Sequence, residues 1–239
     1  MRIAIVSDIH GNLAAFEAVL ADLRDTSPDV TFHAGDLADT GSSPVEVVDR
    51  IGQLGWHGVL GNTDEMLCRP ESLAAFAAKS PGLSNLFSAI EEMAAATRAM
   101  LGPDRLAWLC SLPLVQLDDS FALVHGRPDD PWSAPGAGAT DSELKSVYES
   151  LGRGVAIYAH IHQPYIRELG GFTIVNCGSV GLPYDGDARA SYLLLNDARP
   201  VIRRVPYDIE MEVHRRAASG LPHQEWIASM LRSARPQMP

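Results

Sequence analysis

Side chains that could bind metal ions stand beside glycine-marked turns at five places in this 239-residue chain. Carboxylate, amide oxygen and imidazole ligands together favour borderline divalent metals such as Mn, Fe, Co, Ni or Zn. Seven ligands exceed the needs of one ion when positions stay open for water and substrate, so the set indicates two ions. The candidate ligands are Asp8, His10, Asp36, Asn62, His125, His160 and His162.

A short apolar segment precedes each of these places. Residues 1–8 read MRIAIVSD, and a helix-like stretch begins at Asn12. A buried strand that ends in Asp8 and His10 before a helix brings both side chains to the carboxyl end of a sheet. The pattern recurs in the segments that end at Asp36, Asn62, His125 and His160. The sequence therefore predicts five strand ends that converge on one site.

The order of the elements predicts two β-sheets. Residues 2–62 alternate apolar strands with helical stretches at 12–25 and 44–53, which is typical of a parallel sheet. After Leu114 the sequence instead predicts three hairpins, with turns at 118–119, 170–171 and 197–199. This β-rich half indicates a second, mixed sheet that packs on the first.

Two helical regions accompany these sheets. The Ala- and Met-rich segment at about 70–110 predicts two or three inserted helices, interrupted at Pro81 and Gly82. A tail at about 208–235 predicts one or two amphipathic helices, interrupted near Gly220. No repeat or low-complexity linker divides the chain, so we expect a single domain of residues 1–239.

Composition restricts the possible partners. A net charge of −11 argues against a broad nucleic-acid surface, because affinity for the phosphate backbone depends on clustered Lys and Arg. An anionic substrate would then be attracted locally by bound cations. The chain has neither a signal-peptide pattern nor an apolar run long enough to span a membrane.

The three cysteines are Cys68, Cys110 and Cys177. Their number is odd and their spacing contains no C-x-x-C pair, so we expect neither a disulfide framework nor a cysteine zinc site. We interpret Cys177 as a small buried residue. These observations favour a reducing cytoplasm.

The motifs in their order resemble those of the calcineurin-like metallophosphoesterases. They are Asp8-Ile9-His10-Gly11-Asn12, Gly35-Asp36, Gly61-Asn62-x-Asp64, His125-Gly126 and His160-x-His162. The resemblance extends through 175–181 and 189–192, which are similar to segments of small bacterial and archaeal members. It covers roughly residues 1–66 and 121–196, and the helical insert and the tail contribute little to it.

This resemblance implies a fold and a set of roles. The fold would be a four-layer αββα sandwich of two mixed sheets flanked by helices. One metal would be held by Asp8, His10 and His162, and the other by Asn62, His125 and His160, with Asp36 bridging both. A bridging hydroxide would attack phosphorus in line, and manganese is the favoured metal. Asp36, Asn62 and His125 would then form the catalytic core.

One position departs from the family pattern. The usual motif is Gly-Asn-His-Asp, whose histidine can protonate the leaving group, but this chain has Thr63. A threonine hydroxyl cannot do this at neutral pH, and loss of a general acid costs roughly 10²–10⁴-fold with poor leaving groups. We therefore expect a phosphodiester or phosphoanhydride substrate, small and nucleotide-like, rather than an alkyl monoester.

Several interpretations stay open at this level. Thr63 could contact the substrate. Asn12 could contact a phosphate or cap the helix that follows it. Arg127 could bind a phosphate or pair with Asp129 or Asp130. The Met and Ala stripes of 88–101 could form helix core or a lid over the substrate.

Alternatives for the whole protein also remain. It could be a phosphomonoesterase or protein phosphatase, or a binding scaffold on the same fold with vestigial catalysis. A homo-oligomer is possible. The four remaining histidines are interpreted as core or solvated residues rather than ligands: His33, His57, His214 and His223.

Overall fold

The computed structural model describes residues 1–239 and contains ten strands in two sheets. The strands are β1 (Arg2–Val6), β2 (Val30–His33), β3 (His57–Gly58), β4 (Val115–Leu117), β5 (Ala122–Val124), β6 (Val155–Tyr158), β7 (Tyr165–Glu168), β8 (Thr173–Asn176), β9 (Ala190–Asn196) and β10 (Arg199–Val205). The helices are α1 (Leu13–Thr26), α2 (Pro44–Leu54), α3 (Asn62–Cys68), α4 (Pro70–Ala77), α5 (Ser84–Cys110), α6 (Asp141–Tyr148), α7 (Ile209–Ala218) and α8 (Gln224–Ser233), with short 3₁₀ turns η1 (Pro81–Leu83) and η2 (Glu149–Leu151).

Both sheets are mixed. The first has the order β10-β9-β1-β2-β3, in which β1, β2 and β3 are parallel and β9 is antiparallel to β1. The second has the order β4-β5-β6-β8-β7, with β5, β6 and β8 parallel. All three predicted hairpins form, as β4–β5, β7–β8 and β9–β10.

The third hairpin corrects one expectation. We expected the β-rich half to build the second sheet, but β9 and β10 extend the first sheet beside β1. Leu193 and Leu195 of β9 pack between the two sheets together with Ile3 and Ile5 of β1. A hairpin fixes only its own internal pairing, and the choice of neighbouring sheet depends on which apolar face it can cover.

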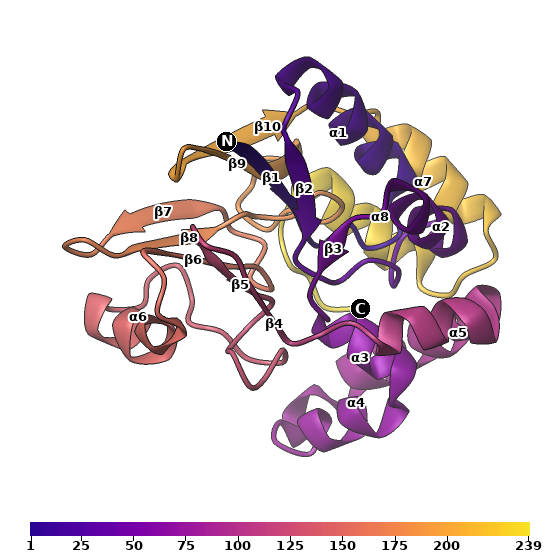
Figure 1. The fold of residues 1–239 in the computed structure, drawn as a ribbon. Helices are drawn as coiled ribbons and strands as arrows, with labels where there is room; N and C mark the ends of the chain where they lie inside the picture. The colour runs from indigo at the N-terminus through magenta and orange to yellow at the C-terminus, as the bar shows by residue number, and fades with distance from the viewer.

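Side chains alternate between two packing faces along the strands, and this alternation produces four layers. Ile3 and Ile5 face the second sheet, whereas Ala4 and Val6 face the core beneath α1 and α2. In the second sheet β6 alternates in the same way, and its outer face packs against α6. Figure 1 shows the two sheets between these helices. The expected αββα sandwich is confirmed.

The insert is helical, as predicted, and comprises α4, η1 and α5. Helix α5 changes direction at Gly102, which has a φ of 70°, just before Pro103. The structure contradicts the expectation about cysteines, because Cys68 at the end of α3 and Cys110 at the end of α5 form a disulfide. Their separation of 42 residues gave no signal, since only the packing of α3 against α5 brings the two ends together. The argument for a reducing compartment loses this support.

The tail forms α7 and α8, interrupted near Gly220 as expected. Helix α7 packs against α1, and the chain then returns through α8 so that the C-terminus lies beside α3 (Figure 1). The indole of Trp226 donates to the carbonyl of Gln237 at 2.9 Å, which fixes the last residues against α8. None of the helices combines the length and apolarity that crossing a bilayer requires.

Candidate functional site

The predicted ligands follow the carboxyl ends of five strands. Asp8 and His10 follow β1, Asp36 follows β2, and Asn62 begins α3 just after β3. His125 follows β5, whereas His160 and His162 follow β6. The side chains from both sheets meet in two adjoining groups that share Asp36.

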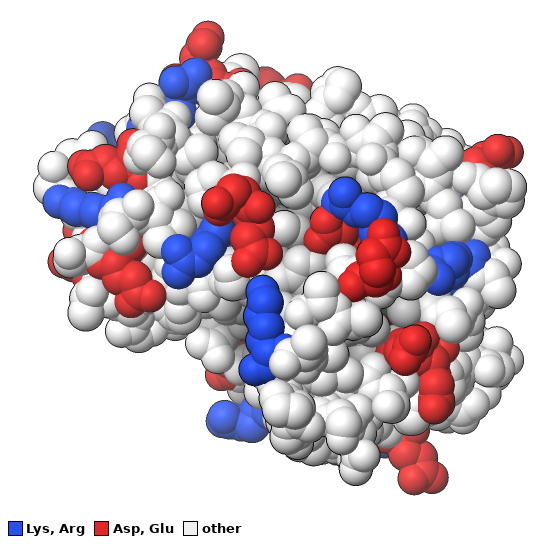
Figure 2. Space-filling model, turned by 90° about the horizontal axis from the view of Figure 1, so that it is seen from below, with Lys and Arg blue, Asp and Glu red and all other residues white.

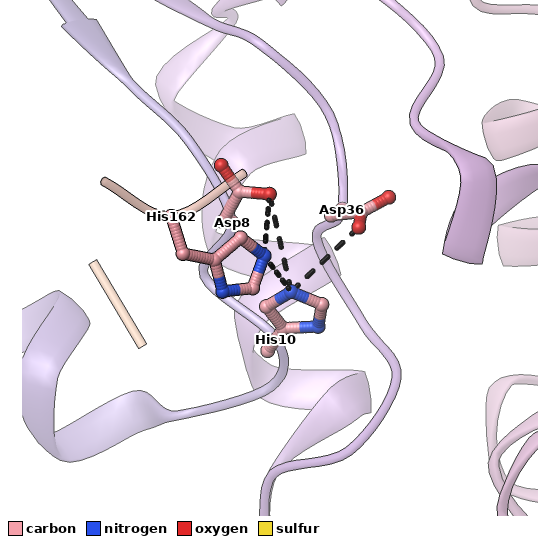
Figure 3. A group of neighbouring side chains, drawn as sticks. All are labelled: Asp8, His10, Asp36 and His162. Carbon is pink, nitrogen blue, oxygen red and sulfur yellow. Dashed lines mark hydrogen bonds and ion pairs between the residues drawn. The ribbon is translucent and has the colours of Figure 1, made fainter. Parts of the chain in front are cut away.

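The first cluster consists of Asp8, His10, Asp36 and His162, and all four residues are buried. One ligand atom from each lies within 4.8 Å of the others. Nε2 of His162 is 3.1 Å from Oδ1 of Asp8, and Nε2 of His10 is 3.6 Å from Oδ2 of Asp36. Figure 3 shows these side chains pointing toward one another from three loops, with Asp8 and His10 on the same one.

The two imidazoles of the first cluster are oriented by backbone carbonyls. Nδ1 of His10 donates to the carbonyl of Asp39 at 3.2 Å, and Nδ1 of His162 donates to that of Leu182 at 2.6 Å. Each Nε2 atom is then left with its lone pair, and the two Nε2 atoms face each other at 3.2 Å. Oδ1 of Asp8 is buried and has no hydrogen-bond partner. Lone pairs directed at one another are stable only around a cation or a proton, so these residues fit a metal ion.

The second cluster consists of Asp36, Asn62, His125 and His160. Nδ1 of His125 donates to the carbonyl of Ala34 at 2.7 Å, which leaves Nε2 to face Oδ1 of Asn62 at 3.0 Å. Oδ1 of Asn62 also lies 2.8 Å from Nδ1 of His160, and Oδ1 of Asp36 lies 3.5 Å from Nε2 of His125. Asp36 therefore directs one carboxylate oxygen toward each cluster.

Five of the seven predicted ligands have a left-handed backbone, namely Asp8, His10, Asp36, His160 and His162, with φ between 51° and 67°. This conformation is uncommon for residues other than glycine and costs about 1–3 kcal/mol each, so the surrounding structure must hold it. Asp64 contributes to this, because its carboxylate accepts hydrogen bonds from the backbone amides of Asp36 and Leu37 at 2.8 and 2.9 Å.

Two glycines allow the loops after β2 and β3 to approach each other closely. A Cβ at Gly35, which has a φ of 86°, would lie 2.5 Å from the amide nitrogen of Gly61. A Cβ at Gly61 would lie 2.0 Å from Oδ1 of Asp36. The glycines of the sequence motifs are therefore required by the close contact between the loops after β2 and β3.

Burial and mutual charge set the protonation of the clusters. Burial lowers the pKa of His10 and, with the charge of His125, lowers that of His160 to about 4, so both imidazoles are neutral at pH 7. Burial acts to raise the pKa of Asp8, but the imidazole of His162 outweighs it and the pKa lies below its usual range. Burial acts to lower the pKa of His162, yet Asp8 raises it overall. Neutral His10 and His160 and ionised Asp8 are already in the forms that bind metals, whereas His162 would release a proton when a metal binds.

Both clusters open into one cavity of about 510 Å³. Its floor contains His10, Asp36, Asn62, His160 and His162. Thr63 also lines it, with a buried hydroxyl that has no hydrogen-bond partner and a backbone amide that donates to Asp36 at 2.9 Å. This placement is compatible with the predicted contact between Thr63 and substrate.

Asn12 and Arg127, the other two predicted substrate contacts, do not line this cavity. Oδ1 of Asn12 accepts from the amide of Ala15, which confirms the helix cap, and its Nδ2 donates to the carbonyl of Gly181. The alternative suggested for Arg127, an ion pair with Asp129 or Asp130, does not form, although its backbone pairs with that of Asp130. The phosphate contacts of Asn12 and Arg127 stay predictions.

The cavity wall contains residues whose position sequence reasoning missed. It is apolar and includes Leu73, Phe76, Phe87, Ile90, Trp132 and Trp226. Tyr184 lines it as well and stacks on His162, with ring centroids 4.4 Å apart and planes at 16°. Within the helical stripe of 88–101, Ala89 and Ala94 are buried while Ile90 and Met93 line the cavity, so the core interpretation is confirmed and a lid over the substrate stays a prediction.

The other predictions about single residues have clear outcomes. His33, the last residue of β2, is buried beside Trp108 with neither ring nitrogen bonded, and His57 and His214 are exposed. His223 precedes α8 and contacts Glu92. Cys177 is buried, and burial raises the pKa of its thiol far above the usual value, which confirms an unreactive core residue. None of these histidines adjoins the clusters.

Comparison with known proteins agrees with this geometry. The family model described as "Calcineurin-like phosphoesterase superfamily domain" matches residues 1–198. A crystal structure of a metallophosphoesterase from Sphaerobacter thermophilus superposes with a TM-score of 0.79 at 28% identity, covering 98% of this chain and 100% of that one. A hypothetical protein from Pyrococcus horikoshii OT3 has the same fold, with a TM-score of 0.83 at 17% identity over 96% and 97% of the two chains.

Two curated relatives extend the comparison. An uncharacterized protein of Methanocaldococcus jannaschii is 29% identical, with 96% of each chain covered. A symmetrical bis(5'-nucleosyl)-tetraphosphatase of Aromatoleum aromaticum is 29% identical over 62% of this chain, which spans 52% of that protein. The fold, the order of the motifs and the relatives all indicate the same family as the matching family model.

Proposed function

Because the chain belongs to the calcineurin-like phosphoesterase superfamily and is a metal-dependent phosphoesterase, we propose that it hydrolyses phosphodiester or phosphoanhydride bonds at a dinuclear centre. The observation that carries this proposal is the carboxylate of Asp36, which directs one oxygen to each cluster. A carboxylate placed in this way can bridge two ions. Manganese is the metal to test first.

The proposal assigns Asp8, His10 and His162 to one ion and Asn62, His125 and His160 to the other. Two bound divalent ions would polarise the phosphoryl group and make water nucleophilic near neutral pH. The chain itself orients the imidazoles of His10, His125 and His162 through Nδ1 and a backbone carbonyl, so that these rings need not reorganise during turnover. Asp36, Asn62 and His125 form the centre of this arrangement.

Thr63 sets the expected leaving group. Thr63 lines the cavity and its buried hydroxyl has no partner, but this hydroxyl stays protonated and cannot supply a proton as a histidine would. Leaving groups that depart as stable anions need that proton least, which favours aryl esters and phosphoanhydrides over alkyl monoesters. The names of the tetraphosphatase relatives support a small nucleotide-like substrate, which would be one kind of phosphoanhydride. Cytoplasmic location stays a prediction.

Metal analysis with a matched pair of variants tests the centre. We expect about two ions per wild-type chain and about one in Asn62→Ala, with kcat/KM for 4-nitrophenyl methyl phosphate reduced by roughly 10²-fold or more. Asn85→Ala makes the same change at an exposed position of α5 and should keep both ions and full activity. Full activity of Asn62→Ala or His125→Ala with Mn would refute the assigned roles. A wild-type preparation with neither metal nor turnover would favour a binding scaffold instead.

A further inference from the structure

The cavity above the clusters has an apolar wall and no positive side chain. Of its 25 lining residues, 15 are hydrophobic, and none is Lys or Arg. Its acidic residues are Asp36 and Asp39, both at the floor. The volume of about 510 Å³ is in the usual range for a small-molecule site, so the wall has room for a substantial part of a substrate.

The wall is built by segments distant from one another in sequence. Phe76 of α4 packs against Trp132 with ring centroids 5.0 Å apart and against Phe87 of α5 at 6.0 Å. Trp226 of α8 and Met238 near the C-terminus also line the cavity. The apolar surface is therefore continuous with the floor and belongs to the same cavity as the clusters.

The absence of cations disfavours a polyphosphate. Two ions at the floor could neutralise one phosphate group, but each further anionic phosphate would lie against apolar side chains without a partner. Lys79 lies near the wall, with its Nζ 5.8 Å from the ring of Phe76, but it does not line the cavity. A chain of several phosphates would therefore lose hydration without compensation.

Hydrogen-bonding groups for a nucleobase are also scarce in the wall. The side-chain amide of Gln237 is already bonded to Ser229 and Ser233 of α8, at 2.6 and 2.8 Å. The indole N–H groups of Trp132 and Trp226 are bonded to Glu65 and Gln237. Besides the cluster histidines, Thr40, Asn62 and Thr63, this leaves only the hydroxyl of Tyr184, which contacts Sδ of Met230 at 4.0 Å. A nucleobase in the wall would leave polar edges unpaired, whereas a hydrocarbon or aryl group would not.

We propose that the substrate is a phosphodiester with a single anionic phosphate and a large apolar substituent, which the wall binds while the clusters hold the phosphate. This inference rests on the proposed function and narrows its substrate class away from polyphosphates. In the step, the oxygen of water bonds to phosphorus and the bond to the leaving oxygen breaks. The leaving group departs as an anion, the two protons of water pass to solvent, and an apolar phosphate monoester remains.

A series of substrates with one leaving group tests the wall. In 4-nitrophenyl alkyl phosphates the leaving group and the charge stay constant while the alkyl chain grows from methyl to octyl. We expect kcat/KM to rise roughly fourfold for each of the first methylenes that becomes buried, mainly through KM. Equal values along the series, or faster cleavage of diadenosine tetraphosphate than of the octyl ester, would overturn the proposal. If the cavity instead held a peptide or a second copy of the chain, kcat/KM would also be equal along the series, and the proposal would be wrong.

Variants at exposed lining positions locate the effect. Leu83 is 39% exposed, so Leu83→Asn should fold, and it should lower kcat/KM for the octyl ester roughly threefold to tenfold more than kcat/KM for the methyl ester. Leu117→Asn makes the same change at a residue that is 48% exposed on β4, outside the cavity, and should change neither ester. Equal losses in the two variants would contradict a specific wall.

A binding measurement that does not depend on turnover distinguishes failure of this proposal from failure of the proposed function. Trp132 and Trp226 line the cavity, so octylphosphonate should change the tryptophan emission of the metal-loaded protein at concentrations where methylphosphonate does not. If no diester is cleaved but octylphosphonate binds selectively, the hydrolytic function fails and the apolar site stands. If diesters are cleaved and the two phosphonates bind equally, only the apolar site fails.

Discussion

The floor and the wall of the cavity are built in opposite ways. The floor holds buried polar side chains whose rings and carboxylates each have an orienting contact, on loops with left-handed backbone. The wall holds partly exposed apolar side chains from α4, α5 and α8. The family match ends at residue 198, so it covers the floor but not the contribution of α8 to the wall. The difference teaches that chemistry and substrate choice are encoded in separate parts of this chain.

The tail nevertheless reaches the floor at one point. Helix α7 buries Glu212, which accepts hydrogen bonds from the amide and the hydroxyl of Ser42 at 2.8 and 3.1 Å. Arg216 is also buried and donates to the carbonyl of Thr40 at 2.8 Å. These contacts hold the loop after Asp36, so the tail both contributes to the wall and stabilises the floor.

The largest effect should come from the residue that both clusters share. Asp36→Asn keeps the shape of the side chain but removes the charge that faces both clusters, so we expect loss of bound metal and a fall in kcat/KM of roughly a thousandfold or more. Metal content and hydrolysis of the methyl ester measure this. Asp104→Asn, at an exposed position of α5, is the matched control and should be unchanged. Normal metal content in Asp36→Asn would show that the floor does not bind metal through Asp36, and the contrast between a metal-binding floor and an apolar wall would then fail.

An intermediate effect should follow from removing the hydrogen bonds between Glu212 of α7 and Ser42 in the loop after Asp36. Glu212→Ala leaves the buried backbone amide of Ser42 without a partner and its hydroxyl with only that of Ser43, which costs about 1–3 kcal/mol and lowers Tm by roughly 3–10 °C. Thermal unfolding measures the change. Glu225→Ala removes an exposed carboxylate from α8 and should leave Tm within about 1 °C. Equal Tm values for the two variants would show that α7 does not support the floor.

The smallest effect should be a gain of activity from a substitution at Thr63, at the edge of the floor. Thr63→His restores a side chain that can donate a proton, so we expect cleavage of esters with alkyl leaving groups to rise roughly tenfold, while 4-nitrophenyl esters change little. The ratio of kcat/KM for the two kinds of ester measures this. Thr63→Ala controls for loss of the hydroxyl and should leave the ratio unchanged. The same change for both esters would mean that proton donation does not limit the reaction.

Much of the fold could be predicted because its signals are local. The hairpin turns at 118–119, 170–171 and 197–199, the cap at Asn12 and the interruption at Gly220 each depend on a few neighbouring residues. The position of the third hairpin in the first sheet and the disulfide between Cys68 and Cys110 were not predictable in this way. Both depend on which surfaces pack together, and sequence spacing does not record that.

The sequence by itself determined which ligand-type side chains lie together, because glycine-marked turns at strand ends place residues such as Asp8, His10 and Asp36 at one edge whatever packs around them. It also identified Thr63 as the departure from the family pattern. Only the tertiary structure decided that Asp36 faces both clusters and that remote segments form an apolar wall without a cation. The physical reason is that ligand identity follows from local backbone geometry, whereas a cavity is the space left by long-range packing.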